Sequence, residues 1–332
     1  MVAARDKKTV VIAIVIFIFS QTLIFACIPR DNDRSTRSLV VKQGTALAEI
    51  AAILKKEGLI HSSTLFMIGS LMYRGRLIAG EYELRADMST IEIVRKMGQG
   101  KRKIYVLKII EGHNIYTIAE TIDRSGIMTR EEFLTLAMDK KYLKNIGVEG
   151  DSLEGYLFSD TYFYSKEIDT EKFIEGIVRR TLKVFDDAGV NQKMASLDMD
   201  MHKTLTLASM IEKESGAREE LPLVSAVFRN RLLRGMSLDC DPTVIYGTKG
   251  FGAPIRKIDL ATRTPYNTYA SKGYPRGPIC SPSKASIMAA LNPAPVDYLY
   301  FVSKNDGTHV FSRDMVEHNR FVTMYQRNRT TQ

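Results

Sequence analysis

The chain has 332 residues, of which 45% are apolar and 26% are charged, and its formal net charge is +9. This composition indicates a globular protein and excludes a disordered one. Lys and Arg are scattered along the chain without a basic arm or an aromatic-basic motif, which argues against a nucleic-acid partner, whereas a polyanionic cell wall or an anionic membrane surface fits the charge.

An uncharged apolar run of nearly membrane-spanning length occupies residues 10–28. It predicts a single membrane anchor over residues 9–28, behind a short cytoplasmic tail at residues 1–8. Basic residues stand on both sides of the run, so charge alone does not settle its orientation. Two alternatives remain open: a cleaved signal peptide, for which no clear cleavage site is present, and a lipoprotein signal that ends at Cys27.

A polar linker at residues 29–38 precedes a segment, residues 39–101, whose pattern predicts strand, helix, helix, strand, helix. The first helix has an apolar stripe and stops at Gly58. Ser62 supplies a capping signal for the second helix, and Ser89 opens the third with a capping pattern. We therefore expect a small α/β subdomain at residues 39–101.

The rest of the chain, residues 102–328, predicts a larger domain of mixed α+β structure. A strand and three helices are expected first, at residues 103–112, 114–126, 130–138 and 171–187. A helix at residues 219–235 follows the central helix described next, and Asp241-Pro242-Thr243 is a turn signal. Beyond it, the pattern predicts turns, one short helix and a terminal pair of strands.

The central helix runs from Thr204 to Gly216 and carries a carboxylate to the edge of its apolar face. Glu214 lies nearer the apolar arc than Glu212 does, and Gly216 is a natural stop. Glu214 therefore belongs to the last helical turn, where the negative end of the helix dipole and partial burial both favour the protonated acid. That environment suits a general acid, although such helix ends are more often solvated and salt-bridged.

Cysteine and histidine patterns argue against a metal or another cofactor. Cys27, Cys240 and Cys280 have no C-x-x-C spacing. Free thiols at Cys240 and Cys280 are favoured over a disulfide between them. His309 and His318 lack a third ligand or an H-E-x-x-H pattern, so we expect no metal site and no cofactor.

Several motifs carry a resemblance to a known family. The Glu-Ser pair after an apolar helix resembles the signature of lysozyme-like lytic transglycosylases. ASMIEKES, followed by VFRNRL, DPTVIYG and TPYNTY, resembles the YceG-like endolytic murein transglycosylases, as does LEGYLFSDTY upstream. The chain departs from the family pattern at Ser159, where proline is usual, at Cys240, where a hydroxyl residue is common, and at Arg276, where proline-glycine is general.

The resemblance implies a membrane-anchored enzyme of the inner membrane, with its catalytic domain outside the cytoplasm. Residues 39–101 would form a LysM-like subdomain, and whether it binds glycan stays open. Peptidoglycan strands would be the substrate, with peptidoglycan synthases as further partners. One glutamate would act as acid and then as base while the 6-hydroxyl of muramic acid attacks its own anomeric carbon, which leaves a 1,6-anhydro end and consumes no water.

The resemblance and the helix pattern together make Glu214 the catalytic acid/base. Eight further residues are expected to contact substrate: Glu154, Ser215, Asp241, Thr243, Tyr246, Asn267, Thr268 and Tyr269. A hydrolytic muramidase is the nearest alternative, because glycosidases generally need a second carboxylate, for which Glu154, Asp239 and Asp241 are the candidates. A non-catalytic wall-binding or divisome scaffold is the alternative from another class.

Overall fold

The computed structural model describes residues 9, 11, 27–248 and 255–327. It has the predicted α+β character and divides into two compact units: residues 1–106 with 163–168, and residues 107–162 with 169–332. The predicted anchor at residues 9–28 lies almost entirely outside the described residues. None of the described helices is long and apolar enough to cross a membrane.

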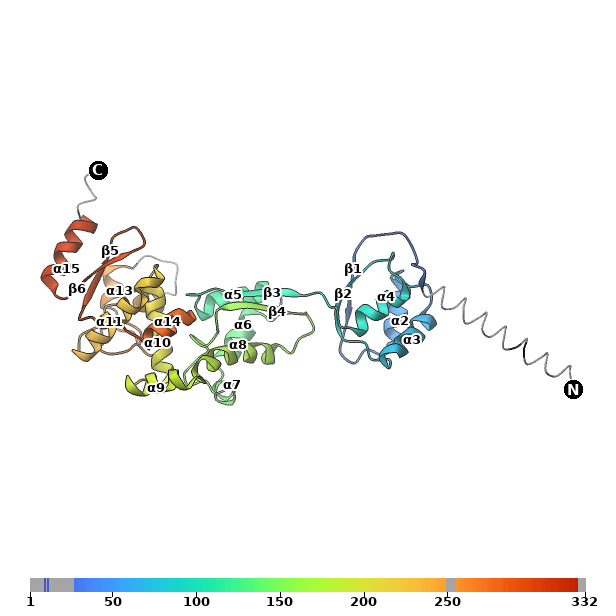
Figure 1. Ribbon diagram of the computed structural model, residues 1–332, viewed down its shortest axis with the longest axis horizontal. Coiled ribbons are helices and arrows are strands. Elements are labelled where there is room, and N and C mark those ends of the chain that lie inside the picture. Colours follow the sequence, from blue (N-terminus) through green and yellow to red (C-terminus); the bar gives the residue numbers. More distant parts are fainter. Residues whose placement is uncertain (1–8, 10, 12–26, 249–254, 328–332) are drawn as a thin grey trace. The chain divides into compact units, whose positions relative to one another are not determined.

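The first unit contains the predicted order of strand, helix, helix, strand, helix (Figure 1). Its elements are β1 (Arg37–Val41), α2 (Leu47–Lys56), α3 (Ser63–Ser70) with the 3₁₀ turn η1 (Leu71–Tyr73), β2 (Gly80–Leu84) and α4 (Thr90–Gly98). Strands β1 and β2 pair antiparallel, with Arg37 opposite Leu84 and Val41 opposite Gly80. The predicted caps form: Ser62 accepts from the Leu65 N–H, and Ser89 and Glu92 form a capping box.

A buried carboxylate lies beside the apolar core of this unit. Glu81 is 3% exposed and accepts hydrogen bonds from the Ser38 and Tyr105 hydroxyls, and Lys166 pairs with it at 3.3 Å. Burial alone would raise the pKa of Glu81, but the bonds from Ser38, Tyr105 and Lys166 outweigh it and lower the pKa to about 2. Glu81 is therefore ionised at neutral pH and holds three segments of the unit together.

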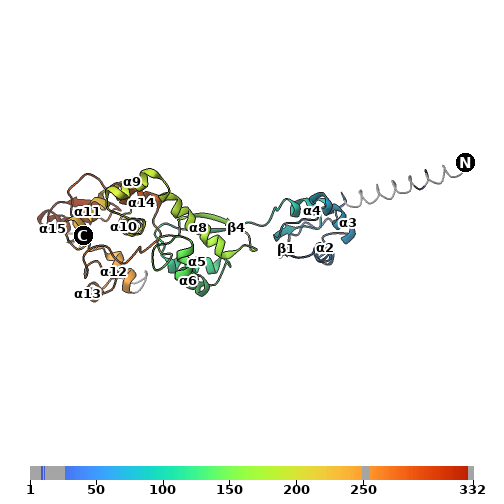
Figure 2. The ribbon, with the colours of Figure 1, turned by 90° about the horizontal axis from the view of Figure 1, so that it is seen from below.

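The second unit begins with a helical part. It contains β3 (Tyr105–Ile109), α5 (Ile115–Arg124), α6 (Arg130–Ala137), α7 (Lys140–Asn145), β4 (Asp160–Tyr164), α8 (Thr170–Phe185) and α9 (Ala188–Ser196). Strand β3 pairs with β4, and the boundary between the two units falls within both strands. In the two ribbon views, α5, α6 and α8 lie beside this strand pair (Figures 1 and 2).

The part that carries the central helix follows. Its elements are α10 (Met201–Glu214), the 3₁₀ turn η2 (Arg218–Glu220), α11 (Leu221–Leu233), α12 (Asp241–Thr248), α13 (Lys257–Ala261), α14 (Lys284–Ala290), β5 (Tyr300–Ser303), β6 (His309–Ser312), α15 (Met315–Val322) and η3 (Thr323–Arg327). Strands β5 and β6 form an antiparallel hairpin, with Tyr300 opposite Ser312.

Helix α10 is the core of this part of the unit. Its residues from Thr204 to Ile211 are all buried, and it packs against α11, α12 and α14. Beyond the buried stretch, the Glu212 carboxylate accepts from the Ser283 N–H at 2.9 Å and the Ser286 hydroxyl at 2.6 Å. Glu212 therefore caps α14, and Glu214 is the last residue of α10.

The predicted turn at residues 241–243 is wrong, because these residues begin helix α12. Pro242 fits there, because the first turn of a helix leaves backbone N–H groups unpaired and so does not need the one that proline lacks. The negative charge of Asp241 is stabilised by the positive N-terminal end of the helix dipole. The pattern also missed strand β4 and helices α7, α9, α13 and α15. Helix α15 buries none of its residues, so it shows no core-facing stripe to detect.

Candidate active site

Glu214 faces a cavity of about 650 Å³ in the second unit. The cavity is lined by the end of α10, by α11 and the loop after it, by the start of α12, by Tyr269 and by β5, β6 and α15. Besides Glu214, its polar lining residues include Arg231, Asp239, Asp241, Tyr269 and His309. The cavity is large enough for at least one sugar ring and its substituents.

The environment of Glu214 keeps its carboxyl group partly protonated at neutral pH. Burial is the largest cause and raises its pKa to about 7; the negative charge of Asp241 acts in the same direction. A hydrogen bond with Cys240 and the positive charge of Arg231 oppose this rise. A carboxyl group with a pKa near 7 can both give and take a proton at neutral pH, which general acid-base catalysis requires.

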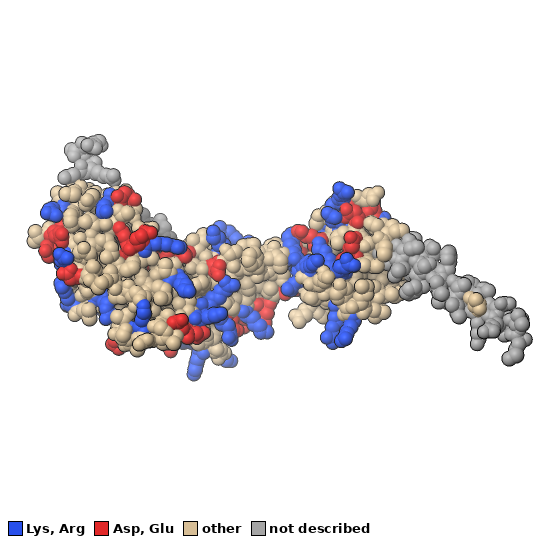
Figure 3. Space-filling model, in the orientation of Figure 1, with Lys and Arg blue, Asp and Glu red and all other residues tan. Residues whose placement is uncertain are grey.

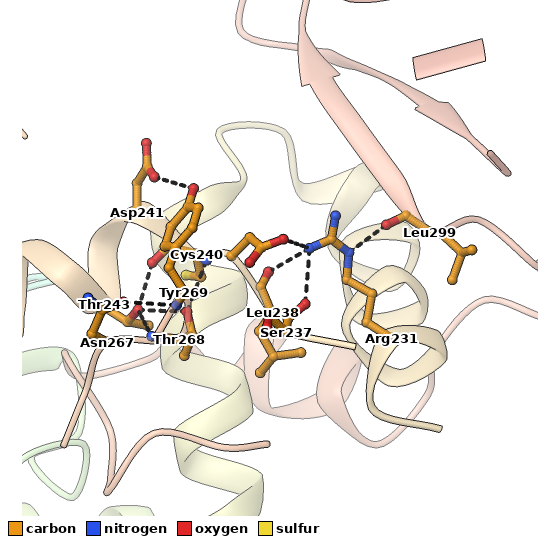
Figure 4. A network of polar contacts seen from close by, with 11 residues as sticks. Arg231, Ser237, Leu238, Cys240, Asp241, Thr243, Asn267, Thr268, Tyr269 and Leu299 are labelled. Atoms are coloured by element: carbon orange, nitrogen blue, oxygen red, sulfur yellow. Dashed lines mark hydrogen bonds and ion pairs between the residues drawn. The ribbon is translucent and has the colours of Figure 1, made fainter. Parts of the chain in front are cut away.

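Two buried threonines hold the chain that leads into α12 (Figure 4). The Cys240 N–H donates to Thr268 Oγ1 at 3.0 Å, and the Thr243 hydroxyl donates to the Cys240 carbonyl at 2.6 Å. The two threonine hydroxyls lie 2.9 Å apart, and neither side chain is exposed by more than 1%. Thr243 and Thr268 are therefore bonded inside the protein and fix the position of Asp241.

Asn267 braces the neighbouring loop. Its amide nitrogen donates to the carbonyls of Leu260 at 2.9 Å and Thr262 at 2.7 Å, and its side-chain oxygen accepts from the Tyr269 N–H at 2.8 Å. This places the Tyr269 hydroxyl 2.6 Å from an Asp241 carboxylate oxygen, to which it donates. Among the predicted contact residues, Asp241 and Tyr269 line the cavity with Glu214.

Ser215 follows the helix end directly. Its hydroxyl donates to the carbonyl of Ala217 at 2.8 Å, which stabilises the turn after α10. Cys240 and Cys280 are buried free thiols, so the disulfide between them does not form, as predicted. Burial raises the pKa of both thiols well above the ordinary value.

Arg231 lines the cavity, and the helical pattern misplaced it. Its helical position predicts the polar side of α11, yet the residue is 8% exposed. Its Nε donates to the Leu299 carbonyl at 2.7 Å, and its Nη1 donates to the carbonyls of Ser237 and Leu238 and to the Asp239 carboxylate at 2.8 Å. The expected polar face is wrong because these partners come from outside the helix.

A histidine-carboxylate pair, which the pattern did not predict, holds the β5–β6 hairpin. His309 Nδ1 lies 2.7 Å from one Glu220 carboxylate oxygen, and the His309 N–H donates to the other at 2.9 Å. The hairpin turn lies close over the end of α10, because a Cβ on Gly216 would stand 3.4 Å from the Gly307 carbonyl. The pair therefore fixes the cavity wall next to Glu214.

Glu154 lies apart from this cavity and is 2% exposed. One of its carboxylate oxygens accepts from the Ile115 N–H and from the Tyr246 hydroxyl, both at 2.9 Å, and the other has no partner among the described residues. Gly155 permits the close approach of Pro278, since a Cβ would lie 2.4 Å from that proline. Glu154 and Tyr246 thus form a second polar cluster, outside the lining of the Glu214 cavity.

The stability of the protein should depend on the protonation of Glu154. Burial raises its pKa from 4.5 to about 7, so the folded state binds the proton more tightly and stability falls as pH rises from 4.5 to 7. We expect Glu154→Gln, which imitates the protonated acid, to raise the free energy of unfolding at pH 8 by on the order of 1–3 kcal/mol and to change it little at pH 4. Urea unfolding at both pH values measures this.

The control for this prediction is Glu131→Gln, because the Glu131 side chain is 78% exposed. It should change stability little at either pH. A Glu154→Gln protein that is less stable than the wild type at pH 8 would contradict the prediction.

The site as a whole defines a class of protein. The carboxyl group of Glu214, with a pKa of about 7, lies at the end of a buried helix and faces an open cavity. The arrangement is that of an enzyme that uses a buried acid to protonate a leaving oxygen, as glycoside-cleaving enzymes do.

The chain belongs to the YceG-like family, whose model matches residues 39–324. It is 29% identical over 312 residues to the endolytic murein transglycosylase of Bacillus subtilis, and the match covers 89% of this chain and 86% of that protein. The protein of the same name from Streptococcus pneumoniae D39 is 28% identical over 339 residues, and this chain spans 61% of its length. A crystal structure of a yceG-like protein from Listeria monocytogenes matches with a TM-score of 0.60 at 30% identity, over 86% of this chain and 99% of that one.

Proposed function

We propose that this chain is an endolytic peptidoglycan transglycosylase, which cleaves the β-1,4 bond between N-acetylmuramic acid and N-acetylglucosamine within glycan strands. The observation that carries the proposal is Glu214, a carboxyl group with a pKa of about 7 in an open cavity. The names of the relatives from Bacillus subtilis and Streptococcus pneumoniae support it.

The proposed reaction needs one acid. The protonated Glu214 gives its proton to the glycosidic oxygen as the bond to the muramoyl anomeric carbon breaks. The resulting carboxylate takes the proton of the muramoyl 6-hydroxyl, whose oxygen forms the new bond to the same carbon. This second transfer restores the protonated Glu214, and the products are a 1,6-anhydro-muramoyl end and a free 4-hydroxyl that keeps the first proton. Tethering favours this attack, with effective molarities that can reach roughly 10⁵ M or more.

A hydrolytic muramidase is the second candidate, because Asp239 and Asp241 line the same cavity as Glu214. Each of these carboxylates already has a strong partner: Arg231 at 2.8 Å for Asp239 and the Tyr269 hydroxyl at 2.6 Å for Asp241. These bonds hold the two side chains in place and occupy one carboxylate oxygen of each. The occupied carboxylates favour the transglycosylase.

Digestion of purified peptidoglycan in heavy-oxygen water separates the two reactions. We expect muropeptides with anhydro ends and no incorporated label at the cleaved anomeric carbon, because the nucleophile belongs to the substrate. Mass spectrometry of the products measures this. Labelled reducing ends as the main product would refute the transglycosylase, and exclusive release of terminal disaccharides would refute its endolytic character.

We further propose that residues 9–28 anchor the protein in the inner membrane, with the second unit outside the cytoplasm, and that the first unit is LysM-like and places the enzyme near glycan strands and the synthases that make them. The apolar run supports the anchor. On the face shown in Figure 3, basic and acidic side chains are interspersed, which fits a wall or membrane environment better than a nucleic-acid surface.

The anchor predicts that the full-length chain resists carbonate extraction from membranes, whereas a chain that starts near Asp31 is soluble. Membrane fractionation with immunodetection measures both. A mature N-terminus at Cys27 that carries lipid, found by mass spectrometry, would overturn the spanning helix in favour of a lipoprotein.

A further inference from the structure

The guanidinium group of Arg231 has a nitrogen that the protein does not use. Nε and Nη1 together donate to three carbonyls and the Asp239 carboxylate. Nη2 has no hydrogen-bond partner among the residues that the structure describes, and Figure 4 shows it pointing away from these acceptors. The two N–H groups of Nη2 belong to a residue that lines the cavity of Glu214.

The position of this nitrogen is fixed by the rest of the side chain. Arg231 is 8% exposed, and its guanidinium carbon lies 4.9 Å from the centre of the Tyr300 ring. With its other nitrogens bonded to backbone carbonyls, the plane of the group cannot turn. Nη2 is therefore a preorganised donor, which loses little entropy when it binds an acceptor.

The charges around the cavity decide which acceptor fits. Glu214, Asp239 and Asp241 line it, and Arg231 is the one Lys or Arg among its described lining residues. Because Arg231 is already paired with Asp239 at 2.8 Å, an incoming carboxylate would meet excess negative charge. A neutral oxygen acceptor meets no such repulsion. Guanidinium only donates, so a carbonyl, which only accepts, suits it best.

We propose that Arg231 is a substrate-binding residue, whose Nη2 donates to a neutral amide carbonyl of the glycan strand held beside Glu214. The choice of ligand rests on the proposed function. Two groups of such a strand offer this chemistry: the 2-acetamido group of each sugar, and the lactyl amide of a muramoyl residue that carries peptide. The bond selects amide-bearing sugars and sets their register against the acid.

The test measures binding to the full-length chain in detergent micelles, with Glu214→Gln present so that nothing is cleaved. Chitotetraose and cellotetraose are both neutral and differ at C2, where one has acetamido and the other hydroxyl groups. By isothermal titration calorimetry we expect chitotetraose to bind about tenfold more tightly, the usual gain from a hydrogen bond to a charged donor. Arg231→Lys should remove this preference, since an ammonium cannot serve the cavity and the backbone carbonyls together.

Arg234→Lys is the matched control, because Arg234 is exposed at the end of the same helix. It should keep the preference. If Arg231→Lys does not fold, Arg231→Gln takes its place, and a preference for chitotetraose that survives in the folded variant overturns the inference.

A second pair of ligands locates the carbonyl: glycan strands with peptide-amidated lactyl groups and strands stripped of peptide. A preference for chitotetraose that the Arg231 variant loses assigns Nη2 to the acetamido group, and a preference confined to the amidated strands and lost in the variant assigns it to the lactyl amide. Equal affinity within both pairs overturns the inference. Because binding is measured without turnover, equal affinities would not contradict the proposed reaction. If the wild type formed no anhydro products, the proposed reaction would be refuted, and the binding result would stand.

Discussion

Glu214→Gln should lower kcat by about 10²- to 10⁴-fold, because the amide has nearly the shape of the acid but cannot deliver the proton. Glu214 is the last residue of α10 and faces the cavity, so the substitution leaves the buried part of the helix unchanged. Release of anhydro-muropeptides from purified strands, followed over time, measures the loss. Retained activity in a folded Glu214→Gln protein would show that another group is the acid and would favour a different mechanism.

Glu212→Gln is the matched control, two residues away on the same helix. Glu212 caps α14 by accepting from the Ser283 N–H and the Ser286 hydroxyl with a single carboxylate oxygen. An amide oxygen has two lone pairs and can accept both bonds, so the variant should fold and keep most of its activity. Equal losses in the two folded variants would sink the assignment of Glu214. No release of anhydro-muropeptides by the wild type either would instead favour the non-catalytic scaffold.

Local signals explain why much of the fold could be predicted. In the first unit, Ser62 and Ser89 cap helices within three residues of themselves. Strand β1 alternates between exposed and buried residues from Ser38 to Val41. At the end of α10, Gly216 marks the stop and Glu214 lies in the last turn. Each of these features depends on neighbours in the sequence, which a pattern can read.

The remaining parts of the cavity depend on residues far apart in the chain. Arg231 is buried because Leu299, 68 residues later, accepts its Nε–H. His309 meets Glu220 across 89 residues. The helical period assigns Arg231 to the polar side, because the period is read from the hydrophobicity of the residues alone. It cannot show that a loop will bring backbone carbonyls to the guanidinium group.

The predicted substrate-contact residues likewise bond partners that are far away in the sequence. Thr243 and Thr268 are separated by 25 residues and bond each other, and Glu154 and Tyr246 meet across 92. Their polar side chains predict a substrate-binding surface, which stays a prediction, and in the fold these side chains also bond each other. Burying a hydroxyl or a carboxyl group requires a hydrogen-bond partner, and that partner can be the protein as well as a ligand.

The pH dependence of the reaction should report the protonation of Glu214. Its pKa is about 7, so kcat/KM should fall about tenfold per pH unit above that value, as the acid loses its proton before it meets the substrate. The rate at which anhydro ends form at low substrate concentration, measured from pH 5 to pH 9, gives this midpoint. A rate that stays constant from pH 6 to pH 9 would exclude Glu214 as the acid.

Two neighbours of Glu214 should move this midpoint in opposite directions. Asp241 raises the pKa of Glu214 by charge repulsion, so Asp241→Asn should shift the descending limb to lower pH. The hydrogen bond with Cys240 stabilises the carboxylate, so Cys240→Ala should shift the limb to higher pH. The midpoint is independent of the absolute rate, so it separates an electrostatic effect on Glu214 from a loss of substrate contact. Shifts in the same direction would contradict the opposite effects of Cys240 and Asp241 on the pKa of Glu214.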